Sequence, residues 1–207
     1  MGQLSAERDV EGTGRRGRSV TLHLDGAAWL RVTESELARL PLSVGEHVDE
    51  ERRIEVEHVL AQDRSREFVV RSLAVRAQTE AEIRRKLAAR DVPPQIAAET
   101  IGIARRYGFL DDAALAERVA LDLRARGYGR RRAERVLRER GVAAATTSRA
   151  LGASFDDVPE IDSAVTALGR RRVGDTDRDR SRAAAFLIRR GFSPAAAWGA
   201  VRRRAAA

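Results

Sequence analysis

One six-residue pattern occurs three times in this chain, at intervals of 50 residues. It is LAARDV at residues 87–92, LRERGV at 137–142 and LIRRGF at 187–192. Each copy starts with leucine, continues with basic residues, and ends with glycine or aspartate followed by an apolar residue. Basic residues before a glycine and an apolar residue are typical of the C-terminal end of a helix. Three equally spaced helix ends predict three copies of a larger unit.

The same interval relates apolar positions outside these stretches. Because tandem repeats bury equivalent positions in one continuous core, we expect most of these residues to be buried. Five sets of three follow the 50-residue interval: Leu73, Leu123 and Val173; Ile83, Ala133 and Ala183; Leu87, Leu137 and Leu187; Val92, Val142 and Phe192; and Ile101, Leu151 and Val201.

Strong helix formers dominate the chain after residue 50, and each unit is expected to contain three helices. Thr79 with Glu82, Asp111, and Ser193 before Pro194 are typical helix starts. The fold class is therefore all-α: three tandem three-helix repeats, 63–110, 111–158 and 159–207, in an elongated curved molecule. The expected helices are 50–61 before the repeats, then 64–77, 80–90 and 94–107, then 112–126, 130–140 and 143–151, and finally 160–173, 179–190 and 194–204.

The N-terminal part has a different pattern. Residues 1–18 are polar and glycine-containing, which predicts a disordered tail. Residues 19–62 are predicted to form a β-hairpin followed by short helices, because Val20, Leu22 and Leu24 alternate with polar residues before an Asp-Gly turn. Thr33 and Glu36 have the spacing of a capping box. The first strand of this hairpin is expected to be an edge that accepts another strand.

Positive charge is concentrated after residue 50. The chain has 39 basic and 31 acidic residues, and all basic residues except Lys86 are arginines. Residues 1–50 contain 6 basic and 9 acidic groups, whereas the rest contains 33 and 22. A basic region of this kind indicates a polyanionic or acidic partner, the alternative being a well-solvated helical surface. The chain has no cysteine and no apolar run long enough for a membrane span, which suits the cytoplasm.

The sequence contains no recognisable catalytic centre. His23, His47 and His58 lie outside the repeats, and no phosphate-binding loop or nucleophile elbow is present. Asp111 and Asp112 are adjacent carboxylates without a nearby histidine, so we interpret them as helix-capping residues. We therefore predict a protein that is not an enzyme and that uses neither a metal nor another cofactor.

The strongest candidates for a binding site lie in the middle repeat. Arg130, Arg131 and Arg132 occupy a predicted helix N-terminus, where the helix dipole opposes cations but free N–H groups favour anions. We therefore expect them, with Arg135, to bind phosphate or carboxylate groups of a partner. The triplets at 170–172 and 202–204 lie near helix C-termini, where cations are locally favourable. The basic face is expected to extend to Arg84, Arg85 and Lys86. Among the aromatic residues, Tyr128 is the best candidate for an exposed side chain, and most of the others are expected in the core.

Four blocks in this order and spacing resemble the RecX family, the regulators of the RecA recombinase: RSLAVRAQTEAEIRRKL (71–87), YGFLDD (107–112), GRRRAERVLRERGV (129–142) and FLIRRGF (186–192). The resemblance covers roughly residues 63–204 and implies a non-enzymatic protein of three tandem helical repeats. It also implies binding in the groove of the RecA–DNA filament, with modulation, usually inhibition, of ATP hydrolysis and strand exchange in recombination, DNA repair and the SOS response.

The expected partner is thus the RecA nucleoprotein filament, with weak binding of single- or double-stranded DNA, no membrane contact, and a monomeric state. The alternative hypothesis is a helical repeat protein that binds nucleic acid independently of RecA through the same basic face. Salt-dependent DNA binding without RecA would favour that alternative.

Overall fold

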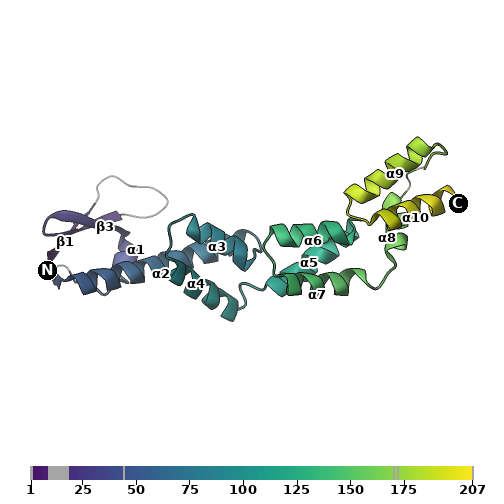
Figure 1. Ribbon diagram of the computed structural model, residues 1–207. Coiled ribbons are helices and arrows are strands. Elements are labelled where there is room, and N and C mark those ends of the chain that lie inside the picture. Colours follow the sequence, from purple (N-terminus) through teal and green to yellow (C-terminus); the bar gives the residue numbers. More distant parts are fainter. Residues whose placement is uncertain (1, 9–18, 44, 170, 172, 207) are drawn as a thin grey trace. The chain divides into compact units, whose positions relative to one another are not determined.

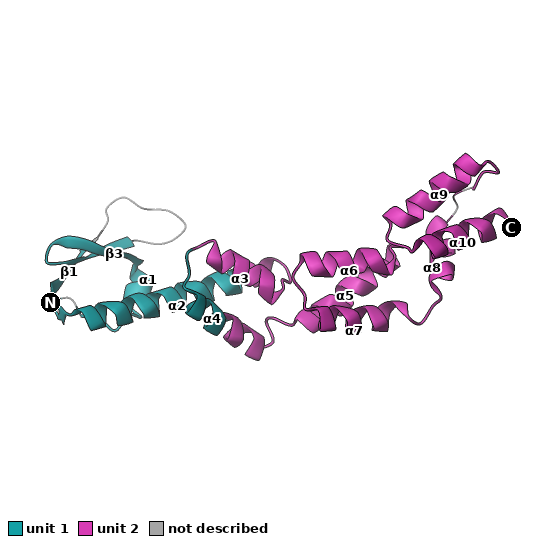
Figure 2. Cartoon of the chain, viewed as in Figure 1, with its two compact units in different colours: residues 1–71, 91–100 teal, residues 72–90, 101–207 magenta. Residues whose placement is uncertain are grey.

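The computed structural model describes residues 2–8, 19–43, 45–169, 171 and 173–206 (Figure 1). Within these ranges it has ten helices and four short strands. The four strands all lie in the first 48 residues. The mostly helical fold with a small N-terminal strand unit agrees with the expectation from the sequence. The chain divides into two compact units, residues 1–71 with 91–100, and residues 72–90 with 101–207 (Figure 2).

The strands of unit 1 form one antiparallel sheet in the order β3-β2-β1-β4. Its strands are β1 (Gly2–Arg8), β2 (Ser19–Leu24), β3 (Ala27–Thr33) and β4 (His47–Val48). The predicted hairpin is confirmed as β2 and β3, but the prediction of a disordered tail is wrong for residues 2–8, because β1 pairs with β2 from Leu4↔Leu24 to Arg8↔Val20. Residues 9–18, the rest of that predicted tail, lie outside the described residues. The first strand of the hairpin, β2, accepts another strand along its free edge as expected: β1 pairs there, so β2 is an interior strand of the sheet.

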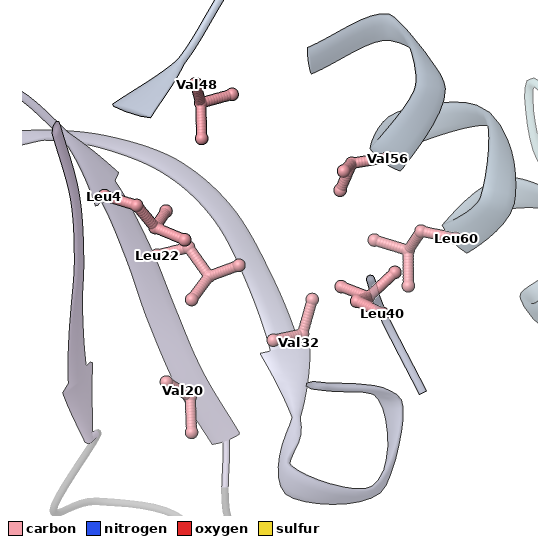
Figure 3. Close-up of a cluster of buried hydrophobic side chains, with 8 residues drawn as sticks. All are labelled: Leu4, Val20, Leu22, Val32, Leu40, Val48, Val56 and Leu60. Carbon is pink, nitrogen blue, oxygen red and sulfur yellow. The ribbon is translucent and has the colours of Figure 1, made fainter. Parts of the chain in front are cut away.

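The core of unit 1 lies between this sheet and the first part of the long helix α2 (Glu50–Val75). Figure 3 shows its buried side chains, which are Leu4, Val20, Leu22, Val32, Leu40, Val48, Val56 and Leu60. The short helix α1 (Glu34–Leu37) begins at the capping box that the sequence predicts: Glu36 N donates to Thr33 Oγ1 at 3.1 Å, and Thr33 N donates to Glu36 Oε2 at 2.7 Å.

Helix α2 is longer than the sequence suggested. We expected one helix over 50–61 and another over 64–77, whereas the structure has a single helix of 26 residues. No glycine or proline occurs between Glu50 and Val75, so nothing in the chain interrupts the hydrogen-bond ladder there.

The remaining helices match the predicted ranges closely, with two exceptions: α8 ends early, and α7, predicted to end at residue 151, continues to Phe155. The eight helices are α3 (Glu80–Ala88), α4 (Pro94–Arg106), α5 (Asp112–Ala125), α6 (Arg130–Glu139), α7 (Ala144–Phe155), α8 (Glu160–Leu168), α9 (Asp177–Arg189) and α10 (Pro194–Ala205). Helix α8 was predicted to reach residue 173, but it ends at Gly169, which has a positive φ of 54°. Thr79, Asp111 and Ser193 each cap a helix N-terminus as predicted.

The recurring six-residue pattern is the end of a helix in all three places. Asp91, Gly141 and Gly191 have positive φ angles of 56°, 83° and 92°, which place them in the left-handed conformation that stops a helix. Helices α3 and α6 start 50 residues apart, as do α4, α7 and α10. The leucines that open the three patterns, Leu87, Leu137 and Leu187, are fully buried.

Two separate apolar clusters lie in unit 2. The first joins α5, α6 and α7 and includes Ala116, Ala120, Ala133, Leu137, Val142, Ala150 and Leu151. The second joins α8, α9 and α10 and includes Ala164, Leu168, Leu187, Phe192, Ala197 and Ala200. Small alanines at the helix contacts allow close packing, so each group of three helices has its own core.

Candidate interaction surface

The arginine triplet at the start of α6 does not form one cluster. Successive helical residues point about 100° apart, so three neighbours face three directions. Arg130 is held internally by an ion pair with Asp156 and a 3.4 Å hydrogen bond to the Leu151 carbonyl. Arg132 is half-buried, whereas Arg131 is exposed. Only Arg131 of the triplet is therefore fully open to a partner.

Several backbone N–H groups at the N-terminus of α6, which the sequence suggested as an anion site, have acceptors within the chain. Gly129 N donates to the Arg190 carbonyl at 2.9 Å, and Arg131 N donates to the Gly191 carbonyl at 3.2 Å. The next two N–H groups donate to the Gly129 carbonyl at 3.0 and 3.3 Å. Another segment of the chain therefore accepts from Gly129 N and Arg131 N, and the binding of phosphate or carboxylate groups by the triplet stays a prediction. The contact requires glycine, since a Cβ at Gly129 would lie 2.4 Å from Gly191 O.

Helix α6 instead presents a row of arginines on its exposed face. Arg131, Arg135 and Arg138 are spaced i, i+4 and i+7, so they lie on one side of the helix. All three are exposed, and their side chains have no hydrogen bond or ion pair within the described residues. We call these three residues the arginine stripe. Arg138 was missed in the sequence, although the helical spacing would have identified it.

The basic residues of α3 are used differently from one another. Arg84 lies 3.9 Å from Glu80, and Lys86 Nζ donates to Ser72 Oγ at 3.0 Å. Arg85 is exposed, and its side chain has no bonded partner in the described part of the chain. Of these three candidates, Arg85 has the environment of the arginine stripe, and it precedes Arg135 by one 50-residue interval.

The aromatic residues also differ from expectation. Tyr128 is half-buried, and the Arg190 guanidinium lies 5.0 Å from its ring centroid. By contrast, Tyr107 and Phe109 are 71% and 65% exposed, so the prediction that most other aromatics lie in the core is wrong for these two. Apolar residues are buried by default in sequence reasoning, and nothing in the chain around this pair signalled an exception.

Arg140 joins two segments of unit 2 that are about 60 residues apart in the chain. Its guanidinium donates to both carboxylate oxygens of Glu82, at 3.0 and 3.2 Å, and to the Ala77 carbonyl at 3.0 Å. Thr79, the cap of α3, donates its hydroxyl to the Arg140 carbonyl at 2.7 Å. The end of α6 is thereby fastened to the start of α3.

Arg190 makes the equivalent joint one interval later. Its guanidinium donates to the carbonyls of Gly127 at 3.0 Å and Arg126 at 2.9 Å. Ala77 and Gly127 are again 50 residues apart, so the two joints use the same pair of positions. Sequence reasoning missed both, because Arg140 and Arg190 look like any other basic residue at a helix end.

Two carboxyl groups of α3 and α5 have shifted pKa values. Burial tends to raise the pKa of Glu82, but hydrogen bonds from Arg140, the Thr79 N–H and Arg76 outweigh it and lower the pKa below its usual 4.5. Burial raises the pKa of Asp112, and the hydrogen bond donated by the Glu80 N–H only partly opposes this. Both shifts follow from structural contacts rather than from a catalytic arrangement.

No group of three or more His, Asp or Glu residues within the described ranges could hold a metal ion. Asp111 caps α5 through the Ala114 N–H at 2.9 Å, and Asp112 accepts from Glu80 N at 3.0 Å. No helix in the described part of the chain is both long and apolar enough to cross a membrane. The described part of the chain is therefore a mostly helical fold with an arginine-rich surface.

Comparison with known proteins finds similarity to RecX proteins over part of the chain. Residues 66–102 match the first three-helix domain of RecX. The chain is 35% identical over 137 residues to the regulatory protein RecX of Deinococcus radiodurans, a match that spans 65% of this chain and 65% of that protein. Over these residues the chain is similar to RecX regulatory proteins.

Solved structures show the same fold. A crystal structure of regulatory protein RecX matches with a TM-score of 0.61 at 22% identity, covering 95% of this chain and 97% of that chain. A RecX crystal structure from Lactobacillus salivarius matches with a TM-score of 0.62 at 18% identity, covering 71% of this chain and 98% of that chain.

Proposed function

We propose that this protein binds the RecA–DNA filament and inhibits its ATP hydrolysis and strand exchange, and thereby regulates recombination and DNA repair. Similarity to RecX regulatory proteins supports a binding role. The observation that carries the proposal is the arginine stripe, Arg131, Arg135 and Arg138. Its guanidinium groups have no internal partner in the described residues, so they can bind phosphate or carboxylate without breaking an existing ion pair.

The proposal includes an architecture of three tandem three-helix repeats. The two joints at Arg140 and Arg190 support it. Arg140 fastens the end of α6 to the segment before α3, and Arg190 fastens the end of α9 to the segment before α6, with residues 50 positions apart. Tandem repeats of this kind present side chains at regular intervals. Arg85 and Arg135 are an example, because they are separated by one 50-residue interval. A regular array of positive groups suits a filament, whose acidic groups and phosphates also repeat.

The test removes the arginine stripe by changing all three residues to alanine. A matched control removes three exposed arginines from other helices, Arg118, Arg149 and Arg189, so that the net charge changes equally. Binding to RecA filaments on single-stranded DNA is titrated at two salt concentrations, and RecA ATP hydrolysis is measured in parallel.

We expect the stripe variant to keep its melting temperature and to bind the filament at least about tenfold more weakly than the control. If the stripe contacts phosphate, the slope of log affinity against log salt should fall by about 2. A stripe variant that regulates RecA as well as the control does would contradict the proposed surface. Wild-type protein that binds bare DNA tightly and leaves ATP hydrolysis unchanged would support the RecA-independent alternative.

A further inference from the structure

The turn between α4 and α5 has a hydrogen-bonded backbone and carries two aromatic side chains. Gly108 N donates to the Arg105 carbonyl at 3.0 Å, and Phe109 N donates to the Ala104 carbonyl at 2.9 Å. Gly108 has a φ of 73°, the left-handed conformation in which glycine ends a helix. Leu110 is buried directly after the turn, and Asp111 then caps α5. The turn is therefore fastened on both sides.

Despite this rigid backbone, the two rings of the turn lie in solvent. Tyr107 is 71% exposed and Phe109 is 65% exposed. Neither ring has a hydrogen bond or a cation–π contact within the described residues. Two large exposed rings are unfavourable in water, and the fold gains little packing from them. An exposed aromatic pair on a hydrogen-bonded turn is typical of an anchor for a partner, because little backbone freedom is lost on binding.

The charges around the turn indicate which kind of partner it fits. Glu80 lies between two arginines, with Arg105 at 3.5 Å and Arg84 at 3.9 Å. Asp112 accepts a hydrogen bond from the Glu80 N–H at 3.0 Å. Arg106 and Asp111 lie next to the turn in the sequence, so the six charged residues linked to it by contact or by sequence are three arginines and three carboxylates.

A phosphate backbone requires an excess of positive charge, which these surroundings lack. Protein interfaces, in contrast, combine central aromatic residues with a rim of mixed charge. The balance of charges therefore favours a protein partner over a nucleic acid.

We propose that Tyr107 and Phe109 form an aromatic anchor that inserts into an apolar pocket of a partner protein, with a rim of both charge signs around the pocket. The inference rests on the proposed function for the identity of that protein: the anchor contacts the protein subunits of the filament, not its DNA. The aromatic anchor is separate in sequence from the arginine stripe, and it contributes to binding through apolar contact rather than through charge.

The test compares a double variant, Tyr107→Ala with Phe109→Ala, with two controls. Leu121→Ala removes another exposed apolar side chain of the same unit, which is 54% exposed, and Tyr107→Phe keeps the ring but removes the hydroxyl. Each full-length protein is melted and is titrated against RecA filaments on single-stranded DNA and against single-stranded DNA alone. We expect the double variant to bind the filament at least about tenfold more weakly, with unchanged melting temperature and unchanged DNA binding. Both controls should bind as the wild type does.

Each other outcome is decisive. A double variant that binds the filament like Leu121→Ala overturns the anchor and leaves the proposed function standing. Lost binding to DNA alone overturns the assignment to a protein partner in favour of base stacking. A lower melting temperature than that of Leu121→Ala shows that the rings support the fold and also overturns the inference. Wild-type protein that does not bind the filament overturns the proposed function and, with it, this partner.

Discussion

Replacing Arg140 with alanine should destabilise unit 2 more than the loss of any exposed arginine. The Arg140 and Glu82 side chains are only 20% and 13% exposed, and the guanidinium donates to both oxygens of the carboxylate. The substitution leaves the half-buried carboxylate with the Thr79 N–H at 3.0 Å and with Arg76 at 3.4 Å. It also leaves the Ala77 carbonyl without this donor.

The expected loss is about 2–3 kcal/mol of unfolding free energy. Hydrogen bonds to charged groups contribute about 1.5–3 kcal/mol, and breaking a fully buried ion pair costs about 3–5 kcal/mol. The expected loss lies below the cost of breaking a fully buried ion pair, because both side chains keep some solvent contact and Arg76 still compensates the charge of Glu82.

The assay is urea unfolding of the full-length protein followed by circular dichroism at pH 7, with Arg138→Ala as the control. Arg138 lies on the same helix, is exposed and has no bonded partner in the described residues, so its loss should change stability by no more than about 0.5 kcal/mol. A double-mutant cycle with Glu82→Gln should give a coupling of at least about 1 kcal/mol. Equal stability of Arg140→Ala and Arg138→Ala would refute the role of this joint.

The same joint predicts a pH dependence. The pKa of Glu82 is below its usual 4.5 in the folded protein. The carboxylate therefore contributes stability that is fully present well above pH 4.5 and is lost as the pH falls through the lower folded pKa. We expect the difference in stability between the wild type and Arg140→Ala to narrow progressively below about pH 4.5, because protonated Glu82 no longer needs a cationic partner.

Two further substitutions test the helical core and the second joint. Leu137→Ala should cost about 2–5 kcal/mol in urea unfolding, because the side chain is fully buried, whereas Leu121→Ala on the surface should change little. Gly191→Ala should lower the melting temperature, by the equivalent of about 1–3 kcal/mol, since φ is +92° and the new Cβ would lie 2.4 Å from Arg132 N. Gly102→Ala, with open space at its Cβ, should be neutral or stabilising; equal effects of both glycine changes would contradict the close contact.

The helices could be predicted from sequence because their signals are local. Caps such as Thr79 and Ser193, and the left-handed stops at Gly141 and Gly191, lie within a few residues of the helix ends that they determine. Strand β1 could not be predicted in the same way. Its sequence is mostly polar, and what makes it a strand is its pairing with β2, a contact between residues about 20 positions apart such as Leu4 and Leu24.

The candidate surface was predicted only in part, because a run of like residues does not show where each side chain points. The triplet at the start of α6 looked like one basic cluster, yet Arg130 is tied to Asp156, and the backbone N–H of Arg131 is bonded to Gly191. Helical spacing was the available signal, and it selects Arg131, Arg135 and Arg138 instead. The exposed pair Tyr107 and Phe109 had no comparable signal, since exposure depends on what the fold leaves uncovered.

The two joints give a structural reason for part of the arginine bias of this chain. Arg140 reaches two carboxylate oxygens and a carbonyl at once, and Arg190 reaches two carbonyls while its guanidinium lies over the rings of Tyr128 and Phe186. A planar guanidinium with five donors can satisfy such divergent acceptors and stack on a ring, whereas a lysine ammonium acts as a compact point charge. Fewer arginines are therefore available to a partner than the positive charge of the chain suggests, because some of them hold one part of unit 2 to another. The residues to test for binding are among those that the fold does not use in this way, and the arginine stripe and Arg85 are the first of them to test.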